Sequence, residues 1–285
     1  MKGTLRVRIE QFAPELGDTT ANVDHLIEAS RTAGADGVDL MITPELSLTG
    51  YELKDSTHRV AMPLGSAPTR SFTGECGVVV GLVELGTDFV PYNAAVHIHA
   101  GRIVHSHRKL YLPTYGMFDE GRYFGRGSTI RAYDGPGGWR YGLLICEDLW
   151  HPSLPYLLAM DGAQVIIVQA AAGGRGGWNG AQAGRFASWA AWHHLACAAA
   201  VAYGVYVIVA NRVGVEGSVV FCGGSFIVAP DGEVIAHGDD LGDDRVTADL
   251  SIDRVMSARR PSAHARDEDP HLVLRELRRI VRAAP

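Results

Sequence analysis

The longest stretch of the chain without a charged residue decides whether it folds in a membrane or in water. Residues 186–211 contain no Lys, Arg, Asp or Glu, and such a stretch is long enough to cross a bilayer once. The stretch is also rich in Ala, holds two histidines and is divided by Gly204. Because glycine commonly follows the last residue of a helix, the pattern favours an Ala-rich helix up to Gly204 and a buried strand over 205–210. We therefore expect no membrane span.

The overall composition is that of a globular chain. With 285 residues, 47% of them hydrophobic and 20% charged, the chain can bury a substantial core. The formal net charge is −6 and there is no block of basic residues, which argues against a nucleic-acid partner. Residues 1–8 hold no apolar signal core, and the four cysteines show no paired spacing. These features favour reduced thiols and a cytoplasmic protein.

Strand and helix patterns alternate along the chain. Residues 5–10 alternate apolar and charged side chains, as a strand with one buried face does, and Asp18 or Thr19 can cap the helix that follows. Residues 170–184 hold six glycines and no regular pattern, so we expect a loop there. Apolar runs and turn residues predict a short helix over 152–160 and further strands over 38–43, 77–84, 94–98, 102–107, 141–145, 165–168, 225–229 and 233–236. Periodicity alone thus indicates an α/β-type domain.

Three chemically useful side chains each come after a predicted strand: Glu45, Lys109 and Cys146. A thiol can attack a carbonyl carbon, a carboxylate can move its proton, and an ammonium group can stabilise the oxyanion that forms. The backbone N–H of Glu147 is a candidate second oxyanion donor, and one such donor is typically worth about 3–4 kcal/mol. Singly, each residue has an ordinary alternative as a buried small residue, a turn residue or a solvated charge. It is their conjunction that predicts nucleophilic catalysis at a carbonyl carbon.

Four histidines lie on the predicted hairpin over 94–107: His97, His99, His105 and His107. A three-residue loop would pair His97 with His105 and place all four on one face, whereas a two-residue loop would separate the two pairs. No cysteine or acidic cluster accompanies them, so we expect no metal site. His107 lies two residues before Lys109, and we expect it mainly to pack.

Asp148 and His151 could in principle form a Cys-His-Asp triad with Cys146. Both follow the cysteine too closely in the chain to fold back onto it easily. The position of His151 before Pro152 more simply shapes the start of a helix. We therefore keep the carboxylate and ammonium partners from the other two strand ends.

Several segments together resemble the nitrilase (carbon–nitrogen hydrolase) superfamily. By this resemblance Glu45 is the general base, Lys109 stabilises the oxyanion and Cys146 is the nucleophile. Glu120 would orient Lys109 or the attacking water, and Tyr51 and Tyr115 are candidate substrate-binding residues. The segments that carry the resemblance are 43–51, 108–113, 119–124, 145–150, 211–214 and 223–225.

The amino-acid sequence of these segments is most similar to the glutaminase half of glutamine-dependent NAD synthetases and to related free-standing amidases. The chain has no Ser-Gly-Gly-x-Asp-Ser loop of an ATP pyrophosphatase, so we expect that it is not a complete synthetase. The resemblance implies a single-domain α-β-β-α four-layer sandwich, built from two mostly antiparallel sheets. We expect the catalytic domain over 1–257 and a tail over 258–285. Relatives commonly dimerise, so a homodimer or larger homo-oligomer is expected.

The tail contains one amphipathic helix, predicted over 271–282, with apolar positions Leu272, Leu274, Leu277 and Ile280. It either caps its own domain or contacts a partner at an oligomer interface.

The resemblance predicts a cofactor-free hydrolase of small linear amides, which uses water and forms a thioester on Cys146. A glutaminase subunit that supplies ammonia to a separate ligase chain, and a nitrile hydrolase, are alternatives with the same chemistry. A catalytically silent binding module is the alternative from another class. Its signature would be a lost triad residue, and Glu45, Lys109 and Cys146 are all present.

Overall fold

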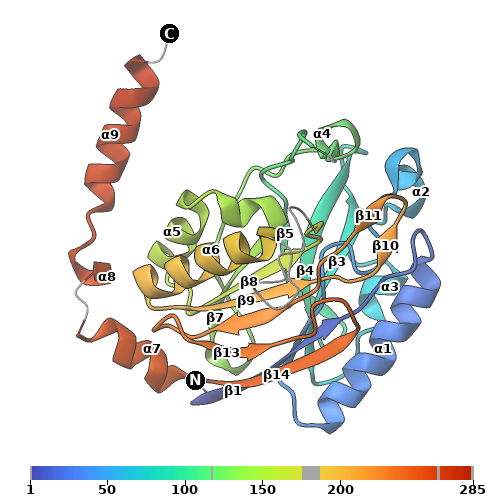
Figure 1. Ribbon diagram of the computed structural model, residues 1–285, viewed down its shortest axis with the longest axis horizontal. Helices are drawn as coiled ribbons and strands as arrows, with labels where there is room; N and C mark the ends of the chain where they lie inside the picture. The colour runs from blue at the N-terminus through green and yellow to red at the C-terminus, as the bar shows by residue number, and fades with distance from the viewer. Residues whose placement is uncertain (1, 117, 175–186, 262–263, 284–285) are drawn as a thin grey trace.

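The computed structural model describes residues 2–116, 118–174, 187–261 and 264–283, and most of the described strands form two six-stranded sheets (Figure 1). The first sheet has the order β14-β1-β2-β3-β4-β5. Its pairs β1–β2 and β2–β3 are parallel and the others are antiparallel. The strands are β1 (Thr4–Gln11), β2 (Leu40–Ile42), β3 (Gly77–Leu85), β4 (Pro91–His99), β5 (Arg102–Arg108) and β14 (Asp244–Ser251).

The second sheet has the order β13-β12-β9-β8-β7-β6. Here β7–β8 and β8–β9 are parallel and the other pairs are antiparallel. Its strands are β6 (Tyr133–Asp134), β7 (Arg140–Ile145), β8 (Val165–Ala170), β9 (Tyr206–Asn211), β12 (Phe226–Val228) and β13 (Val234–His237). A separate small hairpin pairs β10 (Val215–Glu216) with β11 (Val219–Val220).

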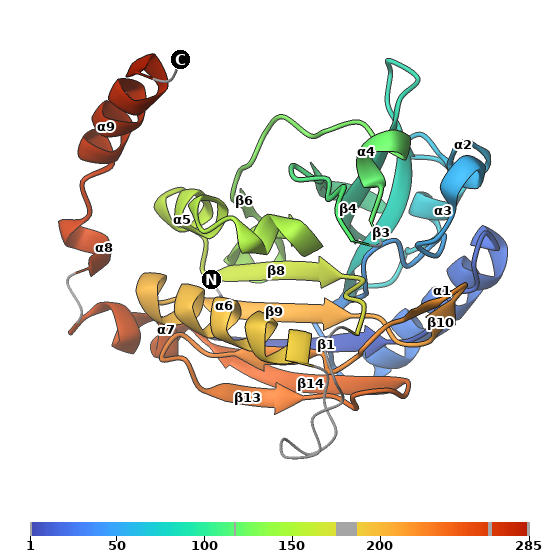
Figure 2. The same ribbon diagram turned by 45° about the horizontal axis from the view of Figure 1, so that its top comes forward.

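The two sheets face each other between outer helices, which confirms the predicted four-layer sandwich (Figures 1 and 2). One core cluster joins apolar residues of β1 and β2 to those of β7, β8 and β9, and includes α5 (Ser153–Met160) and α6 (Ala187–Tyr203). A second cluster packs α1 (Thr19–Ala35) on the outer face of the first sheet. The shorter helices are η1 (Lys54–Ser56), α2 (Thr57–Val60), α3 (Ala67–Arg70), α4 (Glu120–Tyr123), η2 (Pro136–Gly138), η3 (Cys146–Trp150), α7 (Ile252–Arg259), α8 (His264–Asp267) and α9 (Pro270–Ala283).

The charge-free stretch folds as α6 followed by β9. Gly204 lies between them with a φ of +58°, a backbone conformation that glycine adopts without strain. Within the described residues, no helix is both long enough and apolar enough to cross a membrane. Of the loop predicted over 170–184, Ala170 instead ends β8, where it pairs with Asn211, and residues 175–184 lie outside the described residues.

The histidine hairpin has a two-residue turn, yet His97 still pairs with His105. Ala100 and Gly101 form the turn, both with positive φ, and His99 is opposite Arg102. A register shift between His97 and Ile98 inserts one extra residue into β5, and this bulge restores the pairing. His97 hydrogen-bonds the hydroxyl of Tyr133 at 2.9 Å and His105 stacks on the same ring. Both therefore pack against Tyr133, with His97 buried and His105 half-buried.

The C-terminal helix α9 stands away from the sandwich (Figures 1 and 2). None of its described residues is buried, so it does not cap its own domain. At 3.6 residues per turn, Leu274, Leu277, Ile280 and Val281 share one face with Val273, whereas Leu272 lies on the other side of the helix.

Candidate active site

Cys146 occupies a strained position at the end of β7. It is the first residue of η3 and has a φ of +48°, which an L-residue adopts at a cost of about 1–2 kcal/mol. The thiol residue is 5% exposed and lines a cavity of about 210 Å³. The other described residues that line this cavity are Tyr115, Phe118, Glu147, Trp150, Ala172, Gly173, Ser188 and Trp192.

Glu45 is held in the turn after β2 by donors from both sheets. Its Oε1 accepts from Asn93 Nδ2 at 2.7 Å, and its Oε2 accepts from the backbone N–H of Ala171 at 2.8 Å. The side chain is fully buried. The turn lies directly on β3, where a Cβ at Gly81 would approach the Leu46 nitrogen to 2.4 Å. Only glycine at that position lets the turn come this close.

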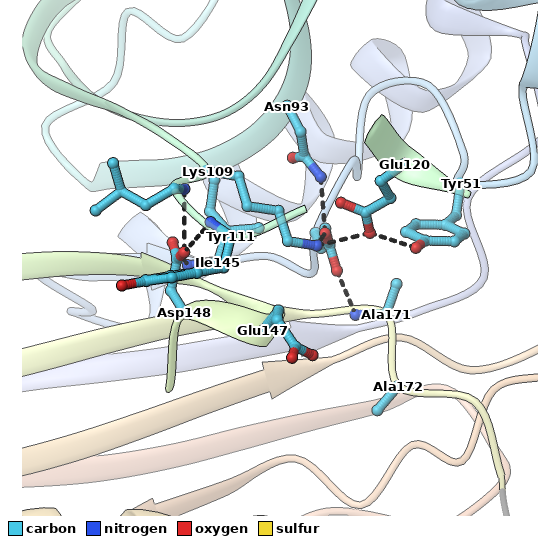
Figure 3. A network of polar contacts seen from close by, with 12 residues as sticks. Tyr51, Asn93, Lys109, Tyr111, Glu120, Ile145, Glu147, Asp148, Ala171 and Ala172 are labelled. Carbon is cyan, nitrogen blue, oxygen red and sulfur yellow. Dashed lines mark hydrogen bonds and ion pairs between the residues drawn. The ribbon is translucent and has the colours of Figure 1, made fainter. Parts of the chain in front are cut away.

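Lys109 joins two carboxylates at the end of β5 (Figure 3). Its Nζ lies 2.8 Å from Glu45 Oε1 and 2.7 Å from Glu120 Oε1. Glu120 is the first residue of α4, and the hydroxyl of Tyr51 donates a hydrogen bond to the same Oε1. All four side chains are at least nine-tenths buried. A buried ammonium group is tolerated here because two carboxylates compensate its charge.

The charges of this cluster shift the pKa values of its members. Burial opposes the charge of Lys109, but Glu120 and Glu45 outweigh it and hold the pKa of Lys109 well above its usual value. Burial raises the pKa of the Cys146 thiol strongly, and Glu45 raises it further, while Lys109 opposes both. Burial also raises the pKa of Glu120 to about 7, against the lowering effect of Lys109. The resting thiol is therefore protonated and needs a base to become a nucleophile.

The structure distributes the sequence-predicted residues over two neighbouring cavities. Glu147 and Tyr115 lie at the cavity of Cys146, where the Tyr115 hydroxyl donates to Glu147 Oε2 at 2.8 Å. Tyr51 and Glu120 instead line a second cavity of about 160 Å³. The Tyr51 hydroxyl thus holds Glu120. The backbone N–H of Glu147 follows directly after Cys146, in the first turn of η3, where N–H groups have no partner within the helix.

Two residues of the site, Asn93 and Asp148, were not found as such by sequence reasoning. Asn93 interrupts a run that forms β4, and an amide in a buried strand is unusual enough to have been a signal. Asp148 hydrogen-bonds His107 at 2.9 Å and does not form a pair with His151, which stacks on Tyr111. Within the described residues, no group of three or more His, Cys, Asp or Glu side chains is arranged to hold a metal ion.

Comparison with known proteins places the chain in a family. Residues 6–260 match the carbon-nitrogen hydrolase family. The glutamine-dependent NAD(+) synthetase of Thermotoga maritima is 34% identical over 255 residues, which cover 87% of this chain and 42% of the synthetase. The corresponding enzyme of Acinetobacter baylyi is 25% identical and is covered to 45%. The chain therefore spans less than half the length of these curated relatives.

Solved structures include close matches of similar size. The amidase of Nesterenkonia sp. AN1, captured after Michael addition of acrylamide at its active site cysteine, has a TM-score of 0.75 at 25% identity, and the match covers 91% of this chain and 98% of the amidase. Nit3 of Saccharomyces cerevisiae shares the fold with a TM-score of 0.77, over 91% of this chain and 94% of Nit3, at 22% identity. The chain belongs to the carbon–nitrogen hydrolase family of the nitrilase superfamily.

Proposed function

We propose that this protein hydrolyses the C–N bond of a small linear amide through a thioester on Cys146. The observation that carries the proposal is the buried contact of Lys109 with Glu45 and Glu120, whose charges act on the Cys146 thiol. This arrangement supplies a nucleophile, a base and an oxyanion donor in a site without bulk water.

The first half-reaction forms the thioester and releases ammonia or an amine. Glu45 takes the thiol proton as the sulfur of Cys146 bonds to the amide carbon. The carbonyl oxygen becomes an oxyanion, which Lys109 Nζ and the Glu147 N–H stabilise. When this intermediate collapses, the C–N bond breaks and Glu45 returns the proton to the leaving nitrogen.

The second half-reaction restores the enzyme with water. Glu45 removes a proton from water, whose oxygen attacks the thioester carbon. The thioester carbonyl oxygen becomes an oxyanion that Lys109 and the Glu147 N–H again stabilise. The C–S bond then breaks, the carboxylic acid leaves and the proton on Glu45 returns to the sulfur. Glu120 keeps Lys109 in place through both halves because it accepts a second hydrogen bond from the ammonium group that Glu45 also contacts.

The cavity supports a small substrate. Its volume of about 210 Å³ lies below the roughly 300–1,000 Å³ of pockets for drug-sized ligands.

The four cysteines, all described, are unpaired, which supports a reducing compartment such as the cytoplasm.

A glutaminase that supplies ammonia to a ligase chain is the second candidate, and one feature of the cavity favours it. Glu147 is the one carboxylate among the described residues that line the Cys146 cavity. An acidic group in a small cavity favours a substrate that carries a cation, and glutamine carries an α-ammonium group in addition to its side-chain carboxamide. The synthetases that match this chain are glutamine-dependent, and they extend well beyond the matched part.

Intact-mass measurement tests the proposed function. A panel of short amides, carbamoyl compounds, nitriles and glutamine is incubated with the protein, and turnover is compared with the mass of the acylated chain. We expect an acyl adduct with each active substrate, and neither adduct nor turnover with Cys146→Ala. An active substrate that never leaves an adduct, or turnover by Cys146→Ala, would contradict the mechanism. Preference for glutamine would select the second candidate.

A further inference from the structure

We propose that Asp148 is a positioning residue, which fixes the distance between the Cys146 sulfur and the Lys109 ammonium group. The Asp148 carboxylate is fully buried and has four hydrogen-bond partners. Figure 3 shows it beside Tyr111 and Ile145. Oδ1 accepts from the backbone N–H groups of Leu110 and Tyr111, both at 3.0 Å. Oδ2 accepts from the Ile145 N–H at 3.1 Å and contacts His107 Nε2 at 2.9 Å.

These four donors belong to the two chain segments that carry the reacting groups. His107 and Leu110 flank Lys109 at the end of β5, which belongs to the first sheet. Ile145 ends β7 in the second sheet and immediately precedes Cys146. One side chain therefore ties the two strand ends to each other across the interface between the sheets.

The tie requires a carboxylate. Within the described part of the chain, His107 is the one basic side chain within ion-pair distance of Asp148. The three backbone N–H groups therefore provide most of the stabilisation of the buried negative charge of Asp148. An amide has one acceptor oxygen in place of two. Asparagine at this position would keep the Leu110 and Tyr111 bonds and point its NH₂ group at the Ile145 N–H. The buried Ile145 N–H would then lose its acceptor, next to a nucleophile that already has strained backbone.

The expected effect of Asp148→Asn is a loss of rate in a folded protein. A misplacement of about 1 Å in a catalytic group can cost about 10²-fold, so we expect kcat to fall by about that factor while KM changes little. Iodoacetamide alkylation of Cys146 gives a second readout. Lys109 opposes the rise in the pKa of the Cys146 thiol. If Lys109 is held less firmly, the pH profile of alkylation shifts to higher pH. A shift of about one pH unit corresponds to a tenfold slower reaction at fixed pH.

Asp161→Asn is the matched control. Asp161 also accepts a backbone N–H, from Ala132 at 2.7 Å, and bonds Arg140, but it lies at the opposite end of β7 from the site. We expect kcat and the alkylation profile of this variant to match those of the wild type. If Asp148→Asn does not fold, His107→Phe removes one of the four donors and should shift the alkylation profile in the same direction by less.

Two results would overturn the inference. One is a folded Asp148→Asn, or a His107→Phe standing in for it, whose alkylation profile equals that of the wild type. The other is a loss of kcat in Asp148→Asn that Asp161→Asn reproduces at the same folded fraction. The inference rests on the proposed function, but alkylation needs no substrate. A wild type that forms no acyl adduct would therefore remove the proposed function alone, while a flat alkylation comparison removes the role of Asp148.

Discussion

Glu120 is a buried carboxyl group whose proton is bound more tightly in the folded chain than in the unfolded one. Its pKa rises from 4.5 to about 7, mainly through burial. The stability that this proton contributes is complete below the unfolded value and is lost as the pH rises through the folded value. Relative to Glu120→Gln, we expect the wild-type unfolding free energy to fall by up to about 3 kcal/mol across this window. Urea titrations at several pH values measure the difference, and parallel curves for the two proteins would contradict it.

At the residue scale, the sequence predicted a set of reacting side chains but missed side chains that hold this set in place. Glu45, Lys109 and Cys146 each follow a predicted strand, so strand ends and a family resemblance were enough to select them. Asn93 bonds Glu45, which is 48 residues away, and Asp148 bonds Leu110, which is 38 residues away. Which strands oppose each other decides those contacts, and that information does not lie in any local pattern.

Among the elements, β3 controls where the proposed base Glu45 lies, and a substitution at Gly81 tests this. A methyl group there would meet backbone atoms of the turn that holds Glu45, at 2.4 Å from the Leu46 nitrogen and 2.8 Å from the Pro44 oxygen. Backbone cannot rotate away as a side chain does, so we expect Gly81→Ala to cost about 1–3 kcal/mol and to displace Glu45. Thermal unfolding and kcat/KM of the folded protein measure the two effects.

Gly34→Ala provides the control for a glycine that packs without a clash. Gly34 lies in α1, and an added Cβ would meet Cys76 Cβ at an ordinary 3.6 Å. Alanine there should be neutral or stabilise the helix by about 0.5–1 kcal/mol, with unchanged kcat/KM. If the Gly81→Ala protein is as active as the wild type and as stable as the Gly34→Ala protein, the turn that holds Glu45 does not depend on glycine at position 81.

Element by element, the fold was largely predictable because buried strands read as apolar runs. The strands over 141–145 and 165–168 were found within two residues of their observed bounds. The prediction that β1 buries only one face is correct for its first half and wrong for its second half. There Arg8 is also buried, because its bonds to Thr247 and Asp36 cover it. The bulge that pairs His97 with His105 depends on register, which loop length alone did not determine.

At the scale of the whole molecule, α9 is the helix that does not pack on the sandwich. The family match ends at residue 260, and α9 begins ten residues later as an arm with an exposed apolar face. Its other face carries Arg275, Arg278, Arg279 and Arg282 against the single acid Glu276. Since the chain as a whole has a net charge of −6, this basic arm complements the acidic remainder of a second copy.

We therefore expect the full chain to be a homodimer or larger, held in part by the apolar face of α9. Leu277 and Ile280 are about half exposed, so replacing both with Glu removes apolar contact without touching the core. The double variant should sediment as a smaller species with an unchanged Tm at high dilution, whereas Arg275→Gln, on the opposite face, should keep the assembly. Analytical ultracentrifugation over a range of concentrations measures this. Equal sedimentation of the double variant and the wild type would mean that α9 has no part in assembly, because a surface that buries this stripe cannot accept two carboxylates without a large desolvation cost.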